Sequence, residues 1–448
     1  MTTNLNNFVQ VRGEDFVVNG EKIFFRGFGL GSWMNLEHFM IGLPGTDTMI
    51  KKAFGEVYGE ERAAKFFDRF LLEFVDEKDF EFLKSIGVNH LRIPFNYKYF
   101  IDDQNPGVYK KEGFAYLDHI VSLCEKYGIY AILDLHSVPG GQNPDWHCDT
   151  NSGLPLFWEY AALRDTVIKL WGHIAQYYKE QPWIAAYDIV NEPSQVTNAK
   201  VFNEFYEKII AEIRQYDEHH IIFIEGNKFT TDFTMIDPID DPQVAYEFHF
   251  YPFVDEPAVL TPEMDRARRK EIFAEAFGKL VSIREKYKRP VWCGELGLVF
   301  EQEQIDFQMT IIEDMLDLCE EHDVSWALWT YKDAATMGIV YPKAGTPWRE
   351  LTDEIKQVWN QHKEQEKGEA LVDYMAATYF KPISAEERYP LQFRMRTIMQ
   401  AICVEQMLKP YLAKRSWEEI AELPASFHWE NCEHWSELAA LIKQYTKV

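Results

Sequence analysis

Cysteine is scarce in this sequence. Only six cysteines occur in 448 residues, they are far apart, and no two of them form a C-x-x-C pair. An even number of cysteines spaced in this way is weak support for a disulfide framework. We therefore expect reduced thiols, most of them buried.

Basic residues are also few. Lysine and arginine together number 46 against 72 aspartates and glutamates, so the formal net charge is −26. A field of this sign repels phosphate backbones and anionic lipid surfaces. Nucleic acids and membranes are therefore not expected partners, and the charge is compatible with a neutral substrate.

Long apolar runs are absent. No stretch of the sequence approaches the roughly 18 apolar residues that indicate a membrane span. Residues 1–15 are polar, without the basic cluster and apolar stretch of a secretory signal. We expect a cytoplasmic protein.

Aromatic residues, in contrast, are plentiful. They make up 15% of the chain, and apolar residues as a whole make up 46%, which is enough for a large core. Flat aromatic faces fill cores and also match the apolar faces of sugar rings. Most of these rings are expected to be core residues.

Strand-like apolar runs alternate with amphipathic segments from residue 23 to residue 366. Eight runs are predicted as strands: residues 23–29, 90–95, 130–136, 185–191, 221–225, 245–251, 290–295 and 325–331. The intervening helices are predicted at residues 62–85, 115–127, 157–179, 201–216, 263–286, 304–321 and 352–365. Eight such units predict a (β/α)8 barrel, a TIM barrel of the α/β class.

Three connections depart from a plain repeat. Residues 226–243, the fifth crossover, are short and turn-rich, so they are predicted to lack a full helix. Residues 33–61 and 137–154 are too long for ordinary connections and would lie at the catalytic end of the barrel.

Beyond residue 366 the pattern is helical. Four helical segments are predicted, at residues 369–379, 391–412, 417–423 and 432–446, with no strand among them. We therefore expect a catalytic domain at residues 1–366 and a helical extension at residues 367–448 that packs on the barrel.

Two glutamates each close a predicted strand. Glu192 ends the run Tyr187-Asp188-Ile189-Val190-Asn191-Glu192, and Glu295 ends Val291-Trp292-Cys293-Gly294-Glu295. Strand ends meet at the mouth of a barrel, so the two acids could face each other there. Glycoside cleavage needs such a pair, about 5–5.5 Å apart for retention of configuration and about 6.5–9.5 Å apart for inversion. The sequence leaves the distance open.

Two neighbours strengthen this interpretation. Asn191 offers an amide to a sugar hydroxyl or to the facing carboxylate. Arg92, at the end of the second predicted strand, supplies a positive charge that could hold a nucleophilic carboxylate ionised. A structural ion pair is the alternative role for Arg92, and the two roles are compatible.

Six short motifs occur in order along the predicted strands. They are Leu91-Arg92-Ile93-Pro94, Leu133-Asp134-Leu135-His136, Asn191-Glu192-Pro193, His249-Phe250-Tyr251, Gly294-Glu295 and Trp326-Ala327-Leu328-Trp329. Together they resemble glycoside hydrolase family 5, the cellulase-type family of retaining (β/α)8 glycosidases.

The resemblance implies a role for each matching residue. Glu192 would be the general acid/base, and Glu295 the nucleophile. The other matching residues would bind the sugar or position the nucleophile: Asn191, Arg92, Tyr251, His136, His249 and Trp329.

The opening of the chain is similar to the exo-β-glucanase branch of that family. The similar segments are Gly27-Phe28-Gly29-Leu30-Gly31-Ser32-Trp33 with Leu36-Glu37, and Pro139-Gly140-Gly141-Gln142-Asn143. The resemblance makes Glu37 a residue of the sugar-binding subsite −1. The chain departs from the branch through Trp146 and His147, which leaves the substrate open and marks Trp146, Trp158 and Trp348 as possible contacts of the leaving group.

The sequence thus predicts a retaining β-glycosidase that acts on β-glucosides or short β-glucans from one end, with a small carbohydrate as its ligand. Endo-acting β-glucanase or cellulase and β-mannosidase activity are the alternatives within the family. A non-catalytic carbohydrate-binding barrel and a metal-dependent hydrolase are the alternatives outside it, and chelator treatment separates the latter. No metal and no cofactor are expected, and the oligomeric state is open.

Overall fold

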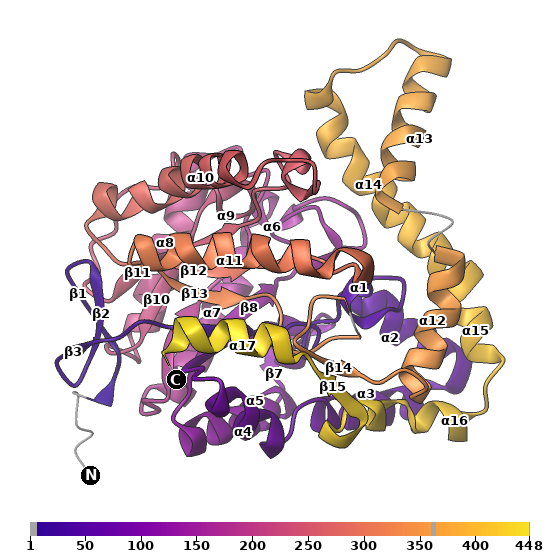
Figure 1. The fold of residues 1–448 in the computed structure, drawn as a ribbon, viewed down its shortest axis with the longest axis horizontal. Helices are drawn as coiled ribbons and strands as arrows, with labels where there is room; N and C mark the ends of the chain where they lie inside the picture. The colour runs from indigo at the N-terminus through magenta and orange to yellow at the C-terminus, as the bar shows by residue number, and fades with distance from the viewer. Residues whose placement is uncertain (1–6, 335, 360–363, 448) are drawn as a thin grey trace.

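The chain forms a closed barrel of eight parallel strands. The computed structural model describes residues 7–334, 336–359 and 364–447. The barrel strands are β4 (Arg26–Gly29), β5 (His90–Asn96), β8 (Tyr130–Ser137), β9 (Ile184–Asp188), β10 (Ile221–Glu225), β11 (Val244–Phe250), β12 (Val291–Leu296) and β13 (Ser325–Leu328). They are adjacent in chain order, and β13 pairs with β4 to close the ring (Figure 1). The predicted TIM barrel is confirmed.

Two strands end earlier than predicted. β9 stops at Asp188 and β13 stops at Leu328, three residues short of the predicted ends in both cases. Glu192 and Trp329 therefore lie in the loops just beyond their strands. Such loops carry the functional residues of this fold.

Helices surround the barrel. They are α3 (Glu60–Phe74), α4 (Glu77–Ser85), α5 (Glu112–Tyr127), α6 (Leu156–Glu159), α7 (Ala161–Tyr178), α8 (Ala199–Arg214), α10 (Arg266–Tyr287), α11 (Ile305–Glu321) and α12 (Pro347–Trp359). The single helix predicted at residues 62–85 is two helices. Asp76 starts the second one, because its side chain accepts hydrogen bonds from the backbone N–H groups of Lys78 and Asp79.

The fifth crossover lacks a full helix, as predicted. Its only helical turn is α9 (Asn227–Thr230), in which Lys228 and Phe229 have left-handed backbone angles. This connection therefore leaves the neighbouring rim of the barrel uncovered by a long helix.

The two long connections lie together at the rim. The first contains α1 (His38–Ile41) and α2 (Asp47–Tyr58), and the second contains the 3-10 turn η3 (Trp146–Cys148). Thr48 Oγ1 donates to Asp149 Oδ2 at 2.6 Å, and Asn35 Nδ2 donates to the carbonyl oxygen of His147 at 2.8 Å. These bonds tie the two insertions into one wall. A small hairpin, β6 (Ile101–Asp102) and β7 (Asn105–Tyr109), follows β5.

A three-stranded sheet that was not predicted covers the opposite end of the barrel. It consists of β1 (Gln10–Arg12), β2 (Asp15–Val18) and β3 (Glu21–Lys22). Phe16 packs against Phe25 at 5.3 Å and Phe223 at 5.9 Å between ring centroids. The sheet thereby keeps water from the amino-terminal end of the barrel interior.

The extension is mainly helical. It contains α13 (Glu364–Tyr379), α14 (Ala385–Cys403), the π-helical turn η6 (Val404–Leu408), α15 (Lys409–Ala413), α16 (Trp417–Ala421) and α17 (Ser436–Thr446). In Figure 1, α13 and α14 form a hairpin that projects from the barrel, and α17 lies along α11. The prediction of helices alone is wrong at one place, because β15 (Cys432–His434) pairs with β14 (Val340–Pro342). The division at residue 366 stays a prediction.

Two further expectations concern the whole chain. All six cysteines are free and buried, as predicted. Among the described residues, no helix combines the length and the apolar character that crossing a membrane requires. The cytoplasmic location stays a prediction.

Candidate active site at the carboxyl end of the barrel

One arginine lies at the centre of the barrel mouth among five carboxylates. The side chain of Arg92, on β5, is fully buried. Its guanidinium nitrogens lie 2.6 Å from Glu295, 2.8 Å from Asp188, 3.0 Å from Asp134, 3.2 Å from Glu247 and 3.6 Å from Glu225. Burial alone would lower the pKa of Arg92, but these carboxylates raise it well above its usual value. Arg92 is therefore a permanent cation.

Most of the carboxylates beneath the mouth hold protons near neutral pH. Burial, together with the neighbouring acids, raises the pKa of Asp134 to about 8, of Asp188 to about 7 and of Glu247 to about 8. The pKa of Glu225 is raised for the same reasons. Because a protonated acid carries no charge, one arginine can be surrounded by this many acids.

Glu295 is the last but one residue of β12, and both of its carboxylate oxygens have donors. Arg92 Nη1 lies 2.6 Å from Oε1, and the Tyr251 hydroxyl donates to Oε2 at 2.9 Å. These contacts fix the carboxylate at the mouth of the barrel. Both sequence-predicted partners of Glu295, Arg92 and Tyr251, are therefore in contact with it.

Glu192 is held in an unusual backbone conformation. Its φ is 50°, in the left-handed region that residues other than glycine seldom occupy. Its N–H donates to Glu225 Oε2 at 2.6 Å, and its carbonyl oxygen accepts from Asn143 Nδ2 at 3.0 Å. Residues in such conformations are often found at functional sites.

The carboxylate of Glu192 lies between two histidines. His249 Nδ1 is 2.7 Å from Oε1, and His147 Nε2 is 3.0 Å from Oε2. Burial would raise the pKa of Glu192, but hydrogen bonds from the two histidines hold it well below its usual value. Despite burial, Glu192 and neighbouring acids raise the pKa of His147 to about 9 and of His249 to about 10. Glu192 is therefore ionised in the substrate-free site, and the two histidines carry the protons.

The two glutamates are close enough for a shared substrate atom. Carboxylate oxygens of Glu192 and Glu295 and a ring nitrogen of His249 all lie within 4.8 Å of one another. This bound joins one oxygen of each carboxylate, and so close an approach favours the spacing of about 5–5.5 Å between the carboxyl groups of retaining enzymes over the roughly 6.5–9.5 Å of an inverting pair.

Other predicted residues present free polar atoms at the mouth. Asn191 Oδ1 accepts from Arg92 at 2.7 Å, whereas its buried amide nitrogen has no hydrogen-bond partner. The Oε1 of Glu37 has only a distant partner among the described residues, His136 Nε2 at 3.5 Å. Buried polar atoms without partners are costly, so atoms that gain partners from a ligand explain this arrangement.

His136 and Trp329 form a flat wall beside these atoms. Their rings stack with centroids 5.4 Å apart and planes 6° apart. His136 Nδ1 lies 2.7 Å from Asp134 Oδ2, and burial lowers the pKa of His136. The stacked pair is therefore a neutral aromatic surface suited to a sugar ring.

Trp146 lies on η3 at the edge of the site. Its ring packs edge-on against His38 at 4.6 Å, and its indole nitrogen is buried without a hydrogen-bond partner. Arg396 of α14 lies with Cζ 5.7 Å from the centre of the ring. The extension therefore reaches the rim of the site.

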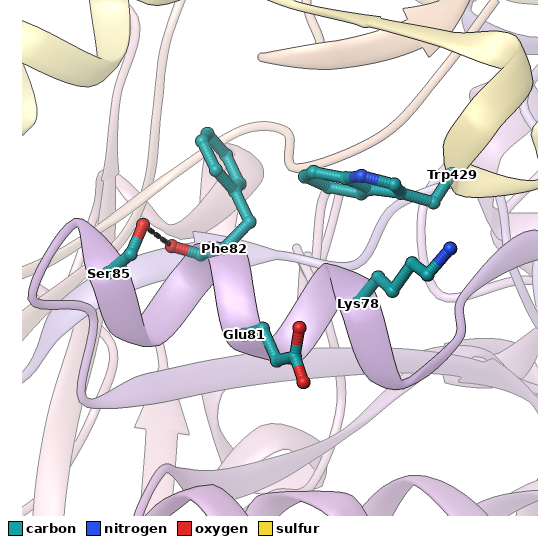
Figure 2. A pocket seen from close by; sticks show the side chains of 5 residues that line it. All are labelled: Lys78, Glu81, Phe82, Ser85 and Trp429. Carbon is teal, nitrogen blue, oxygen red and sulfur yellow. Dashed lines mark hydrogen bonds between the residues drawn. The ribbon is translucent and has the colours of Figure 1, made fainter.

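Figure 2 shows a second hollow, away from these groups. It measures about 470 Å³ and lies between α4 and η8 (Trp429–Asn431). Its lining residues are Lys78, Glu81, Phe82, Ser85 and Trp429. Glu81 is its single carboxylate, so this hollow lacks the pair that glycoside cleavage requires.

Comparison with known proteins places this geometry in a family. A family model described as cellulase (glycosyl hydrolase family 5) matches residues 64–335. The chain belongs to glycosyl hydrolase family 5. It is a glycoside hydrolase, and the match includes Arg92, Glu192 and Glu295.

The chain is similar to family 5 enzymes over most of its length. It is 32% identical to a protein named beta-xylosidase from Phanerodontia chrysosporium, over 95% of this chain and 96% of that protein. It is 26% identical to endoglucanase C from Acetivibrio thermocellus, over 58% of this chain and 84% of that protein.

Solved structures agree on the fold. Thermotoga maritima Cel5A, in complex with mannotriose, aligns with a TM-score of 0.52 and 17% identity over 71% of this chain and 92% of its own. The cellulose synthase subunit Z of Clostridioides difficile aligns with a TM-score of 0.52 and 18% identity over 71% and 94%. These likenesses show the same barrel fold.

Two tryptophans suggested as leaving-group contacts belong to the core of this family 5 protein. Trp348 is 1% exposed and packs against Phe70 at 5.4 Å and Phe427 at 4.9 Å. Trp158 packs edge-on against Phe202 at 5.1 Å and donates its N–H to the carbonyl oxygen of Gln142. Both suggestions were wrong, because aromatic residues beside a barrel rim more often fill the layer beneath it.

Sequence reasoning missed five residues of the polar cluster: Asp134, Asp188, Glu225, Glu247 and His147. A signal was available for two of them. Asp134 and Glu247 lie two residues before His136 and His249 on β8 and β11, and residues two apart on a strand share a face. A charged residue inside a buried strand, two positions from a predicted site residue, is therefore expected to belong to the same site.

In the part of the chain that the structure describes, two sets of three side chains could hold a metal ion. They are Glu192 with His249 and Glu295, and Glu225 with Glu247 and His249. Arg92 lies within 3.6 Å of Glu225, Glu247 and Glu295 and already supplies a positive charge among them.

Proposed function

We propose that this family 5 enzyme is an exo-acting retaining β-glycosidase that removes one sugar from short β-glycosides, with Glu295 as nucleophile and Glu192 as general acid/base. The observation that carries the proposal is the short separation of the two glutamates. One carboxylate oxygen of Glu192 lies within 4.8 Å of one carboxylate oxygen of Glu295. This separation leaves no room for the water molecule that an inverting enzyme places between its acids.

The first step forms a glycosyl ester. The Glu295 carboxylate attacks the anomeric carbon while Glu192, which first receives a proton from His147 or His249, gives that proton to the departing oxygen. Arg92 at 2.6 Å and the Tyr251 hydroxyl at 2.9 Å hold the attacking carboxylate. The amide nitrogen of Asn191 is free to donate to the sugar 2-hydroxyl, an interaction that strengthens in the transition state.

The second step reverses the proton transfer. Glu192 takes a proton from water as the water attacks the anomeric carbon, and the Glu295 ester breaks. His147 and His249 lie 3.0 Å and 2.7 Å from Glu192, so they can exchange a proton with it between the two steps. His147 is thus a positioning residue for the general acid/base.

Exo action is supported by the wall after β4. Glu37 and Trp329 follow β4 and β13, and Met40 of α1 packs in one apolar cluster with Trp329. The free oxygen of Glu37 would accept a hydrogen bond from a hydroxyl at the non-reducing end of the sugar. We assign this side of the mouth to the sugar that is released.

The leaving group would occupy the opposite side. β9 and β10 lie across the ring from β13 and β4, and α14 rests on the loops near β9 and β10. Phe393 lies 6.1 Å from Phe229, Arg396 lies 3.5 Å from Asp145, and Tyr389 lies against Ser194. We propose that α14 forms a wall of the leaving-group site.

The released sugar is proposed to be glucose or xylose. The exo-β-glucanase branch resembles the opening of the chain, and the similar beta-xylosidase matches almost the whole chain. Glucose and xylose share the same configuration at C2, C3 and C4, so one set of hydrogen-bonding partners fits both. Aryl β-glycosides of glucose, xylose, galactose and mannose, with the aryl β-cellobioside, separate these sugars and the endo-acting alternative.

The first experiment measures hydrolysis of that panel, with Glu295→Gln as the blank. We expect release from the glucoside or the xyloside, and a first product with retained configuration by NMR. A product of inverted configuration, or release from the cellobioside alone, would contradict the proposal. Unchanged activity after chelator treatment is expected as well.

The roles of the two glutamates can be tested separately with substrates that differ in their leaving groups. In a dinitrophenyl glycoside the leaving group is dinitrophenolate, which departs without being protonated. Glu192→Gln should therefore still form the glycosyl enzyme from this substrate, whereas Glu295→Gln should not. A 2-deoxy-2-fluoro glycoside should label Glu295, as read by peptide mass. Labelling of Glu192 instead would exchange the two roles.

The wall formed by α14 has its own test. A glycosyl fluoride has no leaving-group sugar, whereas a disaccharide has one. Tyr389→Phe and Arg396→Gln should lower kcat/KM for the disaccharide about tenfold, roughly 1.4 kcal/mol, and leave the fluoride unchanged. Tyr374→Phe and Arg394→Gln, on exposed positions of the same hairpin, are the matched controls.

A further inference from the structure

Exposed apolar side chains are concentrated on the projecting hairpin. Nine of the sixteen exposed large apolar residues among the described positions lie between residues 371 and 402. They are Leu371, Tyr374, Met375, Tyr379, Phe380, Tyr389, Leu391, Ile398 and Ile402. A patch of this kind on a protein surface marks an interaction site.

The exposed residues of α14 follow a helical repeat. Leu391, Met395, Ile398 and Ile402 are spaced i, i+4, i+7 and i+11, and all four are exposed or half-buried. This is the spacing of a coiled-coil seam, which packs against another helix.

The opposite face of α14 is already occupied. Phe393, Arg396, Gln400 and Cys403 are buried, at spacing i, i+3, i+7 and i+10. This stripe rests on the barrel rim, for example where Arg396 pairs with Asp145. Docking on the barrel and on α13, where Arg396 lies 3.9 Å from Glu369, accounts for this stripe of α14 and leaves the Leu391 seam exposed.

α13 extends the same surface. It packs against α14 as the other arm of the hairpin, and Figure 1 shows both helices projecting beyond the barrel. Leu371, Met375 and Tyr379 recur every fourth residue on α13 and are exposed. The hairpin therefore resembles half of a four-helix bundle with its inner apolar positions open to water.

Charge favours a second copy of this chain as the partner. Residues 364–403 carry six acidic and five basic side chains, so the hairpin is nearly neutral, whereas the whole chain has a net charge of −26. Two copies repel each other over most of their surfaces, but not where the hairpins meet. A neutral apolar hairpin is thus the surface on which two such acidic chains can associate.

We propose that two copies of the chain form a dimer by packing their α13–α14 hairpins around a twofold axis as a four-helix bundle. In such an interface each copy presents the same residues to the other. The proposal rests on the exposed seam and the charge distribution, and it is independent of the sugar that the enzyme releases.

The test measures the mass of the full chain in solution. Sedimentation equilibrium at about 10 µM should give twice the chain mass of 52.7 kDa. Ile398→Glu with Ile402→Glu places charges in the seam and should give the monomer mass, while the thermal midpoint and activity per chain stay close to those of the parent. Added salt should tighten the dimer of the unmodified chain, because it screens the repulsion between two acidic bodies.

A matched control replaces two exposed aliphatic residues elsewhere. Leu72→Glu with Val108→Glu adds the same charge on α3 and β7, where the side chains are also exposed, and should leave the dimer intact. A monomeric parent chain overturns the proposal, and so does a dimer that survives the seam substitutions. Binding of a monomeric chain to phosphatidylcholine vesicles, lost in the seam variant, would replace the second copy by a lipid surface.

Discussion

The two ends of the barrel interior are built from the same strands but differ in chemistry. At the amino end, side chains such as Phe223 and Ala245 belong to an apolar cluster. Two residues further along the same strands stand Glu225 and Glu247, which surround Arg92. Residues two apart on a strand face the same side, so both layers point into the barrel. The boundary between them is two residues wide.

This contrast separates stability from catalysis. We call the apolar layer at the amino end of the barrel the lower layer. Each of its fully buried large apolar side chains contributes about 1.5–3 kcal/mol to the free energy of unfolding. The upper layer, at the carboxyl end, consists of Arg92 and the acids around it. It contains buried charges, whose desolvation offsets much of their mutual attraction. The lower layer, covered by β1 to β3, therefore holds the barrel together, and the upper layer is free to be arranged for chemistry.

The largest effect is expected from the upper layer. Glu295→Gln should lower kcat by about 10⁴-fold or more, because the nucleophile is lost. Its free energy of unfolding should change by less than about 1 kcal/mol, because an ion pair is lost while repulsion among the acids is relieved. Glycosidase assays and urea unfolding check both values; a loss of stability that accounts for the loss of activity would break the comparison.

Arg92→Met should lower both stability and activity. It removes the cation at the centre of five buried acids, with which Arg92 forms ion pairs and hydrogen bonds, so we expect a loss of about 3–5 kcal/mol in unfolding free energy together with loss of activity. Arg92→Lys is the matched control. It restores a charge but not the forked geometry, so it should recover part of the stability and little of the activity.

Phe223→Ala tests the lower layer. Phe223 is fully buried and packs against Trp292 at 4.7 Å. The cavity should cost about 3–5 kcal/mol in unfolding free energy, while kcat of the folded enzyme remains at the parent value. Phe223→Leu should cost less. A fall in kcat well below the melting temperature would show that the layers are coupled.

The smallest effect is expected from His147→Gln and depends on pH. Its pKa is raised from 6.5 to about 9 in the folded chain, so its stabilising contribution is fully present below pH 6.5. That contribution is lost as the pH rises through about 9. The variant should be less stable than the parent by about 1–3 kcal/mol near pH 6 and equal to it near pH 10. Phe223→Leu, in contrast, should show a difference that does not vary with pH.

Much of the fold follows from local sequence patterns. The eight apolar runs predict the eight strands because a buried parallel strand reads as a continuous apolar run. The short strands β1 to β3 escape this rule, since they have few residues and one of them, β3, is fully exposed. β15 escapes it too, because its pairing with β14 depends on a contact between residues about 90 positions apart.

The site divides in the same way. By itself the sequence determined the strand count, the family motifs and the two glutamates, because these features depend on residue type and short-range spacing. Only the tertiary structure decided the separation of Glu192 from Glu295 and the close contacts of Glu192 with His147 and His249. It also decided which face of α14 is buried and which is exposed. These depend on ring closure and strand register, which bring together residues that are far apart in the sequence, such as Glu192 and Glu295.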